Sequence, residues 1–197
     1  MNKLLPLIKN IRECRLCANH LPFNPKPVLQ AHSKSRLLIV GQAPGIRVHT
    51  TGIPWNDPSG DRLRYWINLD KKTFYDINQI AIIPIGFCYP GTGPSGDLPP
   101  RKECSTQWLP ALLAGLPDIQ LTLLLGQYAQ RHYLGKHVKQ NLTATVANFS
   151  DYLPDYFPLP HPSPRNNIWL KRNPWFEKLT LPALRKACTK ILNPPAS

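Results

Sequence analysis

Short apolar runs that end at glycines constrain the fold of this chain more than any other feature. The first, Leu37–Val40, is rich in branched residues and stops at Gly41. Two similar runs follow at Ile80–Gly86 and Leu121–Gly126. Runs that are almost wholly apolar predict strands buried on both faces, as in a parallel sheet. Each run therefore predicts a buried strand that ends at a glycine.

Segments with helical spacing separate these strands. Apolar spacing predicts helices at Leu4–Glu13, Arg101–Leu113, Gln127–Leu134 and Trp175–Leu192, the last with a kink at Pro182. A fourth, shorter strand is predicted at Asp155–Pro160, and its internal proline favours an edge position. Strands alternating with helices predict an α/β fold built on a parallel sheet. With 197 residues and no domain-sized linker, we expect one domain spanning residues 1–197.

The loop after the first strand is the strongest candidate for a site. Residues 41–45 read Gly-Gln-Ala-Pro-Gly, which permits tight turns and close backbone approach to a ligand. In the next loop Trp55 stands two residues before Asp57, and Ser59 or Gly60 is expected to cap a helix through Asp61–Ile67. Ligands of open α/β sheets bind beyond the carboxyl ends of the strands. These loops are therefore placed where a ligand would bind.

The composition favours a polyanionic partner. The formal net charge is +13, which suits DNA, RNA or an anionic membrane, although a generally basic solvated surface would give the same number. No apolar run reaches the ~20 residues that a membrane span needs. The amphipathic segment Met1–Asn10 breaks too early for a signal peptide. We therefore expect a cytoplasmic, nucleoid-associated monomer in which disulfides are rare.

Four of the five cysteines form two pairs that are far apart in the sequence. Cys14 and Cys17 form a C-x2-C pair after the first predicted helix, and Cys88 and Cys104 form a wider pair. Four thiolates suit either an iron–sulfur cluster or a tetrahedral zinc ion. Zinc ribbons usually repeat the C-x2-C pair, so the wide second pair favours a cluster, with four unrelated buried thiols as the alternative. Cys188 has core-like spacing within the last helix.

Taken together, these residues resemble the uracil-DNA glycosylase superfamily, in particular its iron–sulfur members, families four and five. Gly41–Gly45 resembles the first family motif, and His161–Asn166 resembles the second, which is also similar to that of the single-strand-selective branch. The cysteine spacing matches the cluster ligands of families four and five, and Thr51–Leu63 resembles a family-five pattern. The resemblance implies a three-layer α/β/α sandwich on a four-stranded parallel sheet. It also implies a 4Fe–4S cluster held by Cys14, Cys17, Cys88 and Cys104, with zinc as the alternative.

The resemblance implies two catalytic residues. Asp57 matches the family-five aspartate and would orient water and offset positive charge on the sugar; the alternative is a helix-capping aspartate. His161 would donate a hydrogen bond to the departing base from a neutral imidazole; the alternative is a loop histidine. No lysine is placed by a motif to form a Schiff base, so lyase activity is not expected.

The resemblance also implies a base pocket and a DNA surface. Trp55 would stack on a flipped base, and Gln42 with the backbone of Gly41 and Ala43 would bind the base edge or a phosphate. Arg165 stands where the superfamily carries its duplex wedge, although a plain surface arginine fits the pattern equally well. The expected backbone contacts are Ser163, Lys171 and Arg172, beside Trp169 and Trp175, which suit the core equally well.

One position departs from the family. The superfamily commonly places a uracil-reading asparagine near the end of the second strand, and here that position falls at Pro84. The expected function is a monofunctional DNA glycosylase of base excision repair that removes a deaminated, uracil-like base. The alternatives are a glycosylase of broader specificity, for hypoxanthine or other lesions, a non-catalytic iron–sulfur DNA-binding protein, and a zinc-stabilised enzyme acting on small nucleotides.

Overall fold

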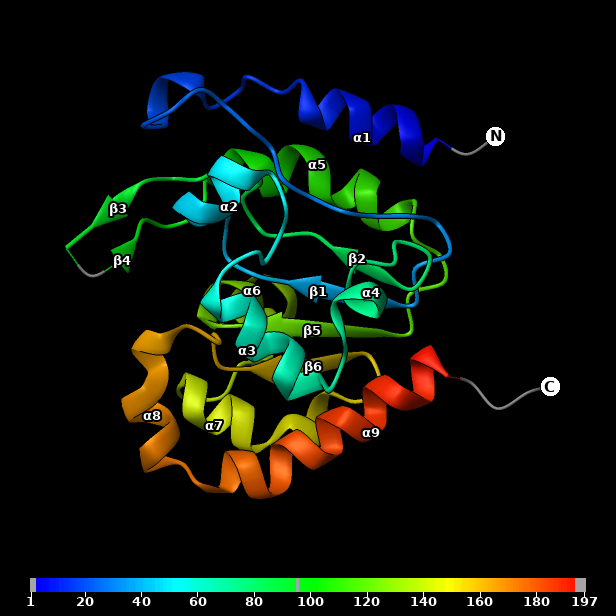
Figure 1. The fold of residues 1–197 in the computed structure, drawn as a ribbon, viewed down its shortest axis with the longest axis vertical. Coiled ribbons are helices and arrows are strands. Elements are labelled where there is room, and N and C mark those ends of the chain that lie inside the picture. The colour runs from blue at the N-terminus through cyan, green and yellow to red at the C-terminus, as the bar shows by residue number, and fades with distance from the viewer. Residues whose placement is uncertain (1–2, 95, 194–197) are drawn as a thin grey trace.

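Four parallel strands form the centre of the molecule. The structure is a computed structural model that describes residues 3–94 and 96–193 (Figure 1). The sheet has the order β2–β1–β5–β6, with every neighbouring pair parallel. Its strands are β1 (Leu37–Val40), β2 (Ile80–Ile82), β5 (Leu121–Leu125) and β6 (Tyr156–Leu159). The predicted parallel sheet is confirmed, and the proline-interrupted β6 lies at an edge as expected.

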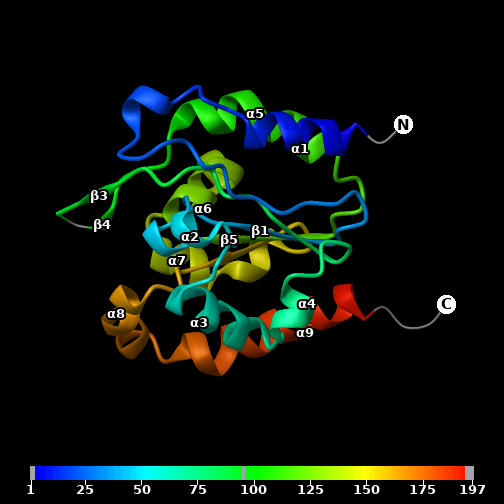
Figure 2. The same cartoon turned by 45° about the horizontal axis from the view of Figure 1, so that its top comes forward.

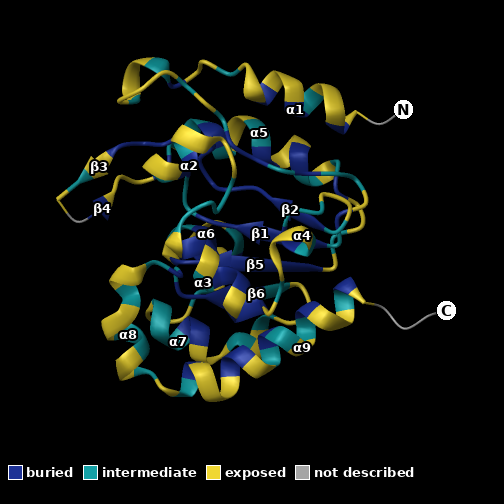
Figure 3. Ribbon diagram, viewed as in Figure 1, coloured by how far each residue is buried: buried dark blue, intermediate teal, exposed yellow. Residues whose placement is uncertain are grey.

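Helices cover both faces of the sheet, which confirms the three-layer α/β/α sandwich (Figure 2). Leu38 and Val40 of β1 pack into one core with α1 (Leu4–Arg12), α5 (Lys102–Ala114) and α6 (Gln127–Leu134). Leu37 and Ile39 pack into the other core with α3 (Pro58–Ile67), α4 (Lys71–Phe74), α7 (Leu142–Ala147) and α9 (Leu181–Leu192). Successive side chains of a strand point to opposite faces, so an unbroken apolar run serves both cores. The strands are accordingly buried, except that Tyr156 at the start of β6 is half-buried (Figure 3).

The carboxyl ends of the strands meet at one edge of the sheet. The strand arrows point toward α2 (Ile46–Thr51), α8 (Asn167–Arg172) and a small hairpin of β3 (Thr92–Gly93) and β4 (Gly96–Asp97) (Figure 1). Short 3-10 turns occur at Ala18–His20, Gly135–His137, Phe149–Tyr152 and Pro164–Asn166. The loops at this edge hold the residues singled out in the sequence.

Some predicted boundaries were wrong for identifiable reasons. Helix α3 begins at Pro58 rather than after Ser59 or Gly60, because Asp57 caps it and Pro58 is favourable in the first turn. A π-helical turn at Phe176–Thr180 leads directly into α9, and Pro182 lies in the first turn of α9, just after this junction. No helix in the described ranges is both long enough and apolar enough to cross a bilayer.

Candidate active site

A cavity opens at the carboxyl edge of the sheet, between loops that are far apart in the sequence. It encloses about 810 Å³, counting the space at its open mouth. Both predicted catalytic residues and several predicted base-binding residues contribute to its wall. The lining residues are Val28, Gly41, Ala43, Pro44, Gly45, Val48, Pro54, Trp55, Asp57, Ser59, Ile82, Pro84, Asp97, His161, Ser163 and Arg165. The fold therefore brings the loops after β1 and β6 to one hollow.

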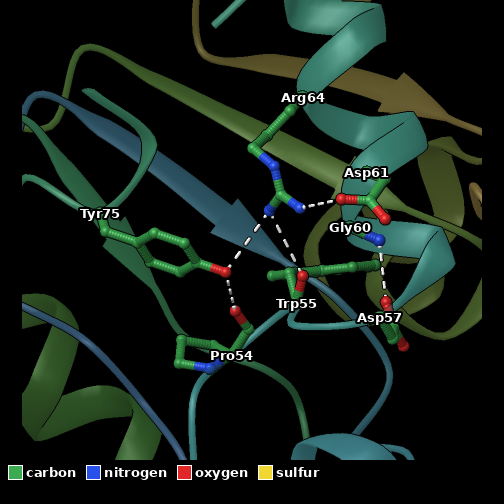
Figure 4. Close-up of polar contacts among 7 residues, drawn as sticks. All are labelled: Pro54, Trp55, Asp57, Gly60, Asp61, Arg64 and Tyr75. Carbon is green, nitrogen blue, oxygen red and sulfur yellow. Dashed lines mark hydrogen bonds and ion pairs between the residues drawn. The ribbon is translucent and has the colours of Figure 1, made fainter. Parts of the chain in front are cut away.

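Asp57 both caps a helix and lines the cavity. Its Oδ1 accepts a hydrogen bond from the backbone N–H of Gly60 at 2.8 Å, which is the usual N-cap bond (Figure 4). Within the described chain its second oxygen, Oδ2, has no hydrogen-bond partner. Asp57 is therefore a helix cap, and the cap leaves one carboxylate oxygen available to a ligand or water.

His161 follows β6 and is held as a neutral imidazole. Its Nδ1 accepts a hydrogen bond from the backbone N–H of Ser163 at 3.2 Å, so the ring proton of the neutral form resides on Nε2. Asn166 Nδ2 donates to the His161 carbonyl at 2.7 Å and fixes the backbone. Desolvation lowers the pKa of His161 to about 4, against the opposing effect of the Asp97 carboxylate. At neutral pH the residue is an uncharged hydrogen-bond donor.

Trp55 forms one wall of the cavity in an unusual backbone conformation. Its φ of 56° lies in the left-handed region, which is rare for a bulky residue. The indole ring lies 5.5 Å from the His161 ring, measured between centroids, at an interplanar angle of 34°. The ring also approaches Gly41 so closely that a Cβ there would lie 2.9 Å from Trp55 Cζ2. Glycine at the first-motif position therefore makes room for the tryptophan.

Gln42 does not line this cavity. Its side-chain Nε2 donates to the carbonyl of Leu98 at 2.8 Å and to that of Asp97 at 3.4 Å. The amide therefore holds the β3–β4 hairpin against the loop after β1. In the structure, Ala43 and Gly41 remain at the cavity wall, whereas the Gln42 amide is occupied by protein carbonyls.

Two polar residues of the cavity, Asp97 and Ser59, were not predicted as site residues from the sequence. Asp97 ends the hairpin and accepts a hydrogen bond from Thr92 Oγ1 at 3.2 Å, and Ser59 lies in the first turn of α3. The only sequence signal for Asp97 is that its Gly- and Pro-rich loop follows the second strand. Pro84, where a base-reading asparagine was expected, lines the cavity together with Val28 and Ile82. This part of the wall is apolar.

The predicted DNA-contacting residues divide into two groups. Ser163 and Arg165 line the cavity, and Arg165 packs so closely on Gly96 that a Cβ there would overlap its guanidinium. Lys171 and Arg172 are exposed at the end of α8 and are not cavity residues. The tryptophans beside them belong to the core, as the alternative held. Trp169 Nε1 donates to Thr143 Oγ1 at 2.8 Å, and its ring meets that of Trp175 edge-on.

The four predicted cysteine ligands line a second, smaller cavity. They come from the chain after α1, the loop after β2 and the first turn of α5, and they are joined in the cavity wall by Leu21, Pro25, Pro27 and Phe87. All four thiols are free. Cys188 is instead buried in the core under α9, as predicted. The topology thus gathers the two cysteine pairs at one place.

Four cysteine thiols are a donor set that either an iron–sulfur cluster or a zinc ion would use. Burial, together with repulsion from the neighbouring cysteines, raises the pKa of Cys104 to about 12 and of Cys88 to about 11. Four thiolates would therefore need a cationic centre to be stable there. Among residues 3–94 and 96–193, no group of three or more Cys, His, Asp or Glu side chains is arranged to hold a metal ion.

Comparison with known proteins places the chain in a family. A family model for the Uracil DNA glycosylase superfamily matches residues 29–185. A solved structure with similarity to this chain is the solution NMR structure of a candidate uracil DNA glycosylase from Methanosarcina acetivorans. The two sequences are 14% identical, and the match covers 82% of this chain and 98% of that chain with a TM-score of 0.48. The range matched by the family model contains both loops that carry Asp57 and His161.

Proposed function

Because the chain belongs to the uracil-DNA glycosylase superfamily, whose members are hydrolases acting on N-glycosyl bonds, we propose that it is a monofunctional DNA glycosylase. It flips a deaminated, uracil-like base out of DNA, hydrolyses the N-glycosidic bond with water and leaves an abasic site for base excision repair. The observation that carries the proposal is that Asp57 and His161 line the same cavity, with the Trp55 ring against His161.

His161 acts on the base. As the glycosidic bond breaks, negative charge develops on the departing pyrimidine and its exocyclic oxygens. The Nε2–H of a neutral imidazole stabilises that charge by donating a hydrogen bond, and the Ser163 N–H bond to Nδ1 keeps the ring in this tautomer. Because the pKa of His161 is about 4, the residue performs this role without a net charge at neutral pH. The Trp55 ring offers the adjacent surface on which a flipped base can stack.

Asp57 acts on the sugar and the water. Its Oδ1 is fixed by the Gly60 N–H, which orients the carboxylate, while Oδ2 has no partner among the described residues. An ionised carboxylate at this place offsets the positive charge of an oxocarbenium-like sugar and orients the attacking water. The helix cap and the catalytic role therefore use different oxygens of one side chain.

A broader substrate range is a second candidate, favoured by the apolar wall around Pro84. A proline side chain has no hydrogen-bonding group, and its neighbours in the wall, Val28 and Ile82, have none either. Discrimination between bases by side-chain hydrogen bonds is therefore weaker on this wall than with an asparagine. Under this alternative the enzyme also removes hypoxanthine or other deaminated bases.

DNA is the proposed partner of a nucleoid-associated, cytoplasmic monomer. The charge of +13 suits a polyanion, and Ser163 and Arg165 stand at the cavity while Lys171 and Arg172 extend the basic surface on α8. Phosphate contacts release counterions, so affinity for an oligonucleotide should fall steeply with salt concentration. An affinity that does not change with salt would count against DNA.

We propose that Cys14, Cys17, Cys88 and Cys104 hold a 4Fe–4S cluster, with zinc as the alternative. The support is their convergence on one cavity with apolar walls. When bound, the cluster would cross-link the segment after α1, the loop after β2 and α5. Val28 follows Pro25 and Pro27 of this second cavity and lines the active-site cavity, so the cysteine region supports one active-site wall.

The test is a panel of oligonucleotides that contain uracil, hypoxanthine or other modified bases, scored for abasic sites. We expect release of uracil by the wild type and its loss in Asp57→Asn and His161→Ala. The matched controls Asp118→Asn and His137→Ala change exposed residues outside the cavity and should keep the wild-type rate. Binding without base release would favour the non-catalytic DNA-binding protein, and activity on mononucleotides alone would favour the nucleotide enzyme.

A further inference from the structure

A buried arginine holds the turn that carries Trp55. Arg64 extends from α3, is only 6% exposed and donates from Nη1 to the Trp55 carbonyl at 3.3 Å (Figure 4). The same nitrogen reaches the Tyr75 hydroxyl at 3.4 Å, and Nη2 pairs with Asp61 Oδ1 at 2.6 Å. The guanidinium also lies over the Phe74 ring, 5.1 Å from its centroid. The cation is thus fixed from several sides.

Two successive carbonyls of the turn are held by side chains. Tyr75 donates its hydroxyl proton to the Pro54 carbonyl at 2.9 Å, and Arg64 holds the next carbonyl, that of Trp55 (Figure 4). Both donors come from beyond the turn, in α3 and just after α4. This network fixes the peptide on which the left-handed conformation of Trp55 depends. Without these hydrogen bonds, the backbone of Trp55 would be freer to leave the strained left-handed conformation.

Close packing leaves the turn little freedom elsewhere. A Cβ on Gly60 would overlap the Trp55 carbonyl oxygen, so α3 touches the turn directly. Gly41 approaches the indole ring from the cavity side. The carbonyl and the ring of Trp55 are therefore both held, and a shift of the carbonyl would move the ring relative to His161.

Stability alone does not account for a charge at this place. The partner Asp61 is 69% exposed, so solvent screens the ion pair. An apolar residue of similar volume often stabilises a buried position equally well. An apolar residue at position 64 could not, however, donate the hydrogen bond that Arg64 Nη1 makes to the Trp55 carbonyl.

We propose that Arg64 is a positioning residue for base release, which acts by fixing Trp55 against His161 before substrate binds. The effect on base release rests on the proposed glycosylase function, whereas the fixing of Trp55 by Arg64 does not. Arg64 touches neither base nor sugar, and its effect passes through Trp55. Preorganised geometry is worth about 100-fold in rate when a reacting group is displaced by ~1 Å.

The first experiment reports on position without needing activity. The chain has five tryptophans, so the protein labelled with 5-fluorotryptophan should give five 19F resonances, of which Trp55→Phe identifies one. Arg64→Met should move or broaden the Trp55 resonance. Tyr75→Phe is a milder change that removes only the hydroxyl and its bonds to Arg64 and to the Pro54 carbonyl, so it should also move or broaden the Trp55 resonance and serves as the test if Arg64→Met does not fold. The matched control is Arg185→Met, since Arg185 also donates to carbonyls of α3, at Tyr65 and Trp66, away from the cavity.

The second experiment is a double-mutant cycle on single-turnover base release. Arg64→Met should slow release by about 10- to 100-fold in the wild type and by less than about twofold in a Trp55→Ala background, because coupled residues are not additive. Arg185→Met should change the rate of base release by less than about twofold in both the wild-type and the Trp55→Ala backgrounds.

The outcomes separate the two proposals. An unchanged Trp55 resonance in both Arg64→Met and Tyr75→Phe, or an equal rate loss in both backgrounds, overturns the positioning role. A moved resonance in a protein that releases no base from any oligonucleotide supports the role of Arg64 in holding Trp55 and overturns the glycosylase function.

Discussion

Substitutions of Asp57 should affect stability and the rate of base release to different extents. Replacing it by asparagine retains an oxygen acceptor for the Gly60 N–H, which lies 2.8 Å from Oδ1, but removes the charge. Replacing it by alanine removes both. An uncompensated charge loss at a helix N-terminus costs ~0.5 kcal/mol, and loss of the cap itself costs ~1 kcal/mol more.

These costs translate into measurable melting temperatures. For a protein of this size, 1 kcal/mol corresponds to about 2–4 °C, so Asp57→Asn should lower Tm by ~1–2 °C and Asp57→Ala by ~3–6 °C. Both variants lose the only negative charge that the side chain could bring to the sugar and water. Base release should therefore fall by at least about 100-fold in both.

The assay combines thermal unfolding followed by circular dichroism with single-turnover base release well below Tm. Asp70 provides the matched control, because it caps α4 through the same kind of bond, from Thr73 N at 2.7 Å, outside the cavity. Asp70→Ala should lower Tm and leave the rate unchanged. If the Asp57 variants rank in activity as they rank in stability, with the asparagine variant close to wild type, Asp57 acts only as a helix cap and the catalytic assignment is wrong.

Three further predictions concern other parts of the site. The pKa of His161 falls from about 6.5 to about 4 on folding. Between these two pH values the unfolded chain therefore binds a proton at His161 that the folded chain does not bind. The wild type should lose up to ~3 kcal/mol of stability relative to His161→Asn as pH falls from 6.5 to 4 and no more below that, measured by urea unfolding; a constant difference would refute the desolvated imidazole. Gly41→Ala should slow base release by about 10-fold or more by displacing Trp55, and Trp55→Phe in the same chain should relieve the steric conflict; equal rates for Gly41→Ala and wild type would show that the ring can move freely. Cys104→Ser should abolish iron absorbance near 400 nm, whereas Cys188→Ser, in the other core, should retain it; a colourless wild type that contains zinc would exclude the cluster.

The arrangement of the sheet could be predicted from the sequence because burial leaves a local signature. A central parallel strand is covered on both faces, so β1 is apolar at every position and β5 at every position except Thr122, and β6 is marked as an edge strand by its proline. Once the strands are parallel, their carboxyl ends must share one edge. This shared edge brings His161, which follows β6, close to the loop after β1, and the segment after α2 places Asp57 in the same cavity. The roles of these residues remain predictions.

Contacts within the site were less predictable. The sequence shows Gln42 in a ligand-binding motif, yet its amide binds the hairpin carbonyls of Asp97 and Leu98. It gives no sign that Asp97 enters the cavity or that Arg64 holds the Trp55 carbonyl. These contacts depend on the direction in which a loop leaves its strand and on a few hydrogen bonds between loops.

The sequence by itself therefore determined the strands, the glycine turns after them and the two cysteine pairs, since each is a pattern of neighbouring residues. Only the tertiary structure decided that the cysteine pairs converge, that Asp57 shares its two oxygens between a helix cap and the cavity, and that a buried guanidinium fixes the Trp55 wall. The physical reason is that apolar burial is repeated along a strand and can be recognised locally. A polar contact, in contrast, joins two single atoms whose positions depend on the packing of the whole chain.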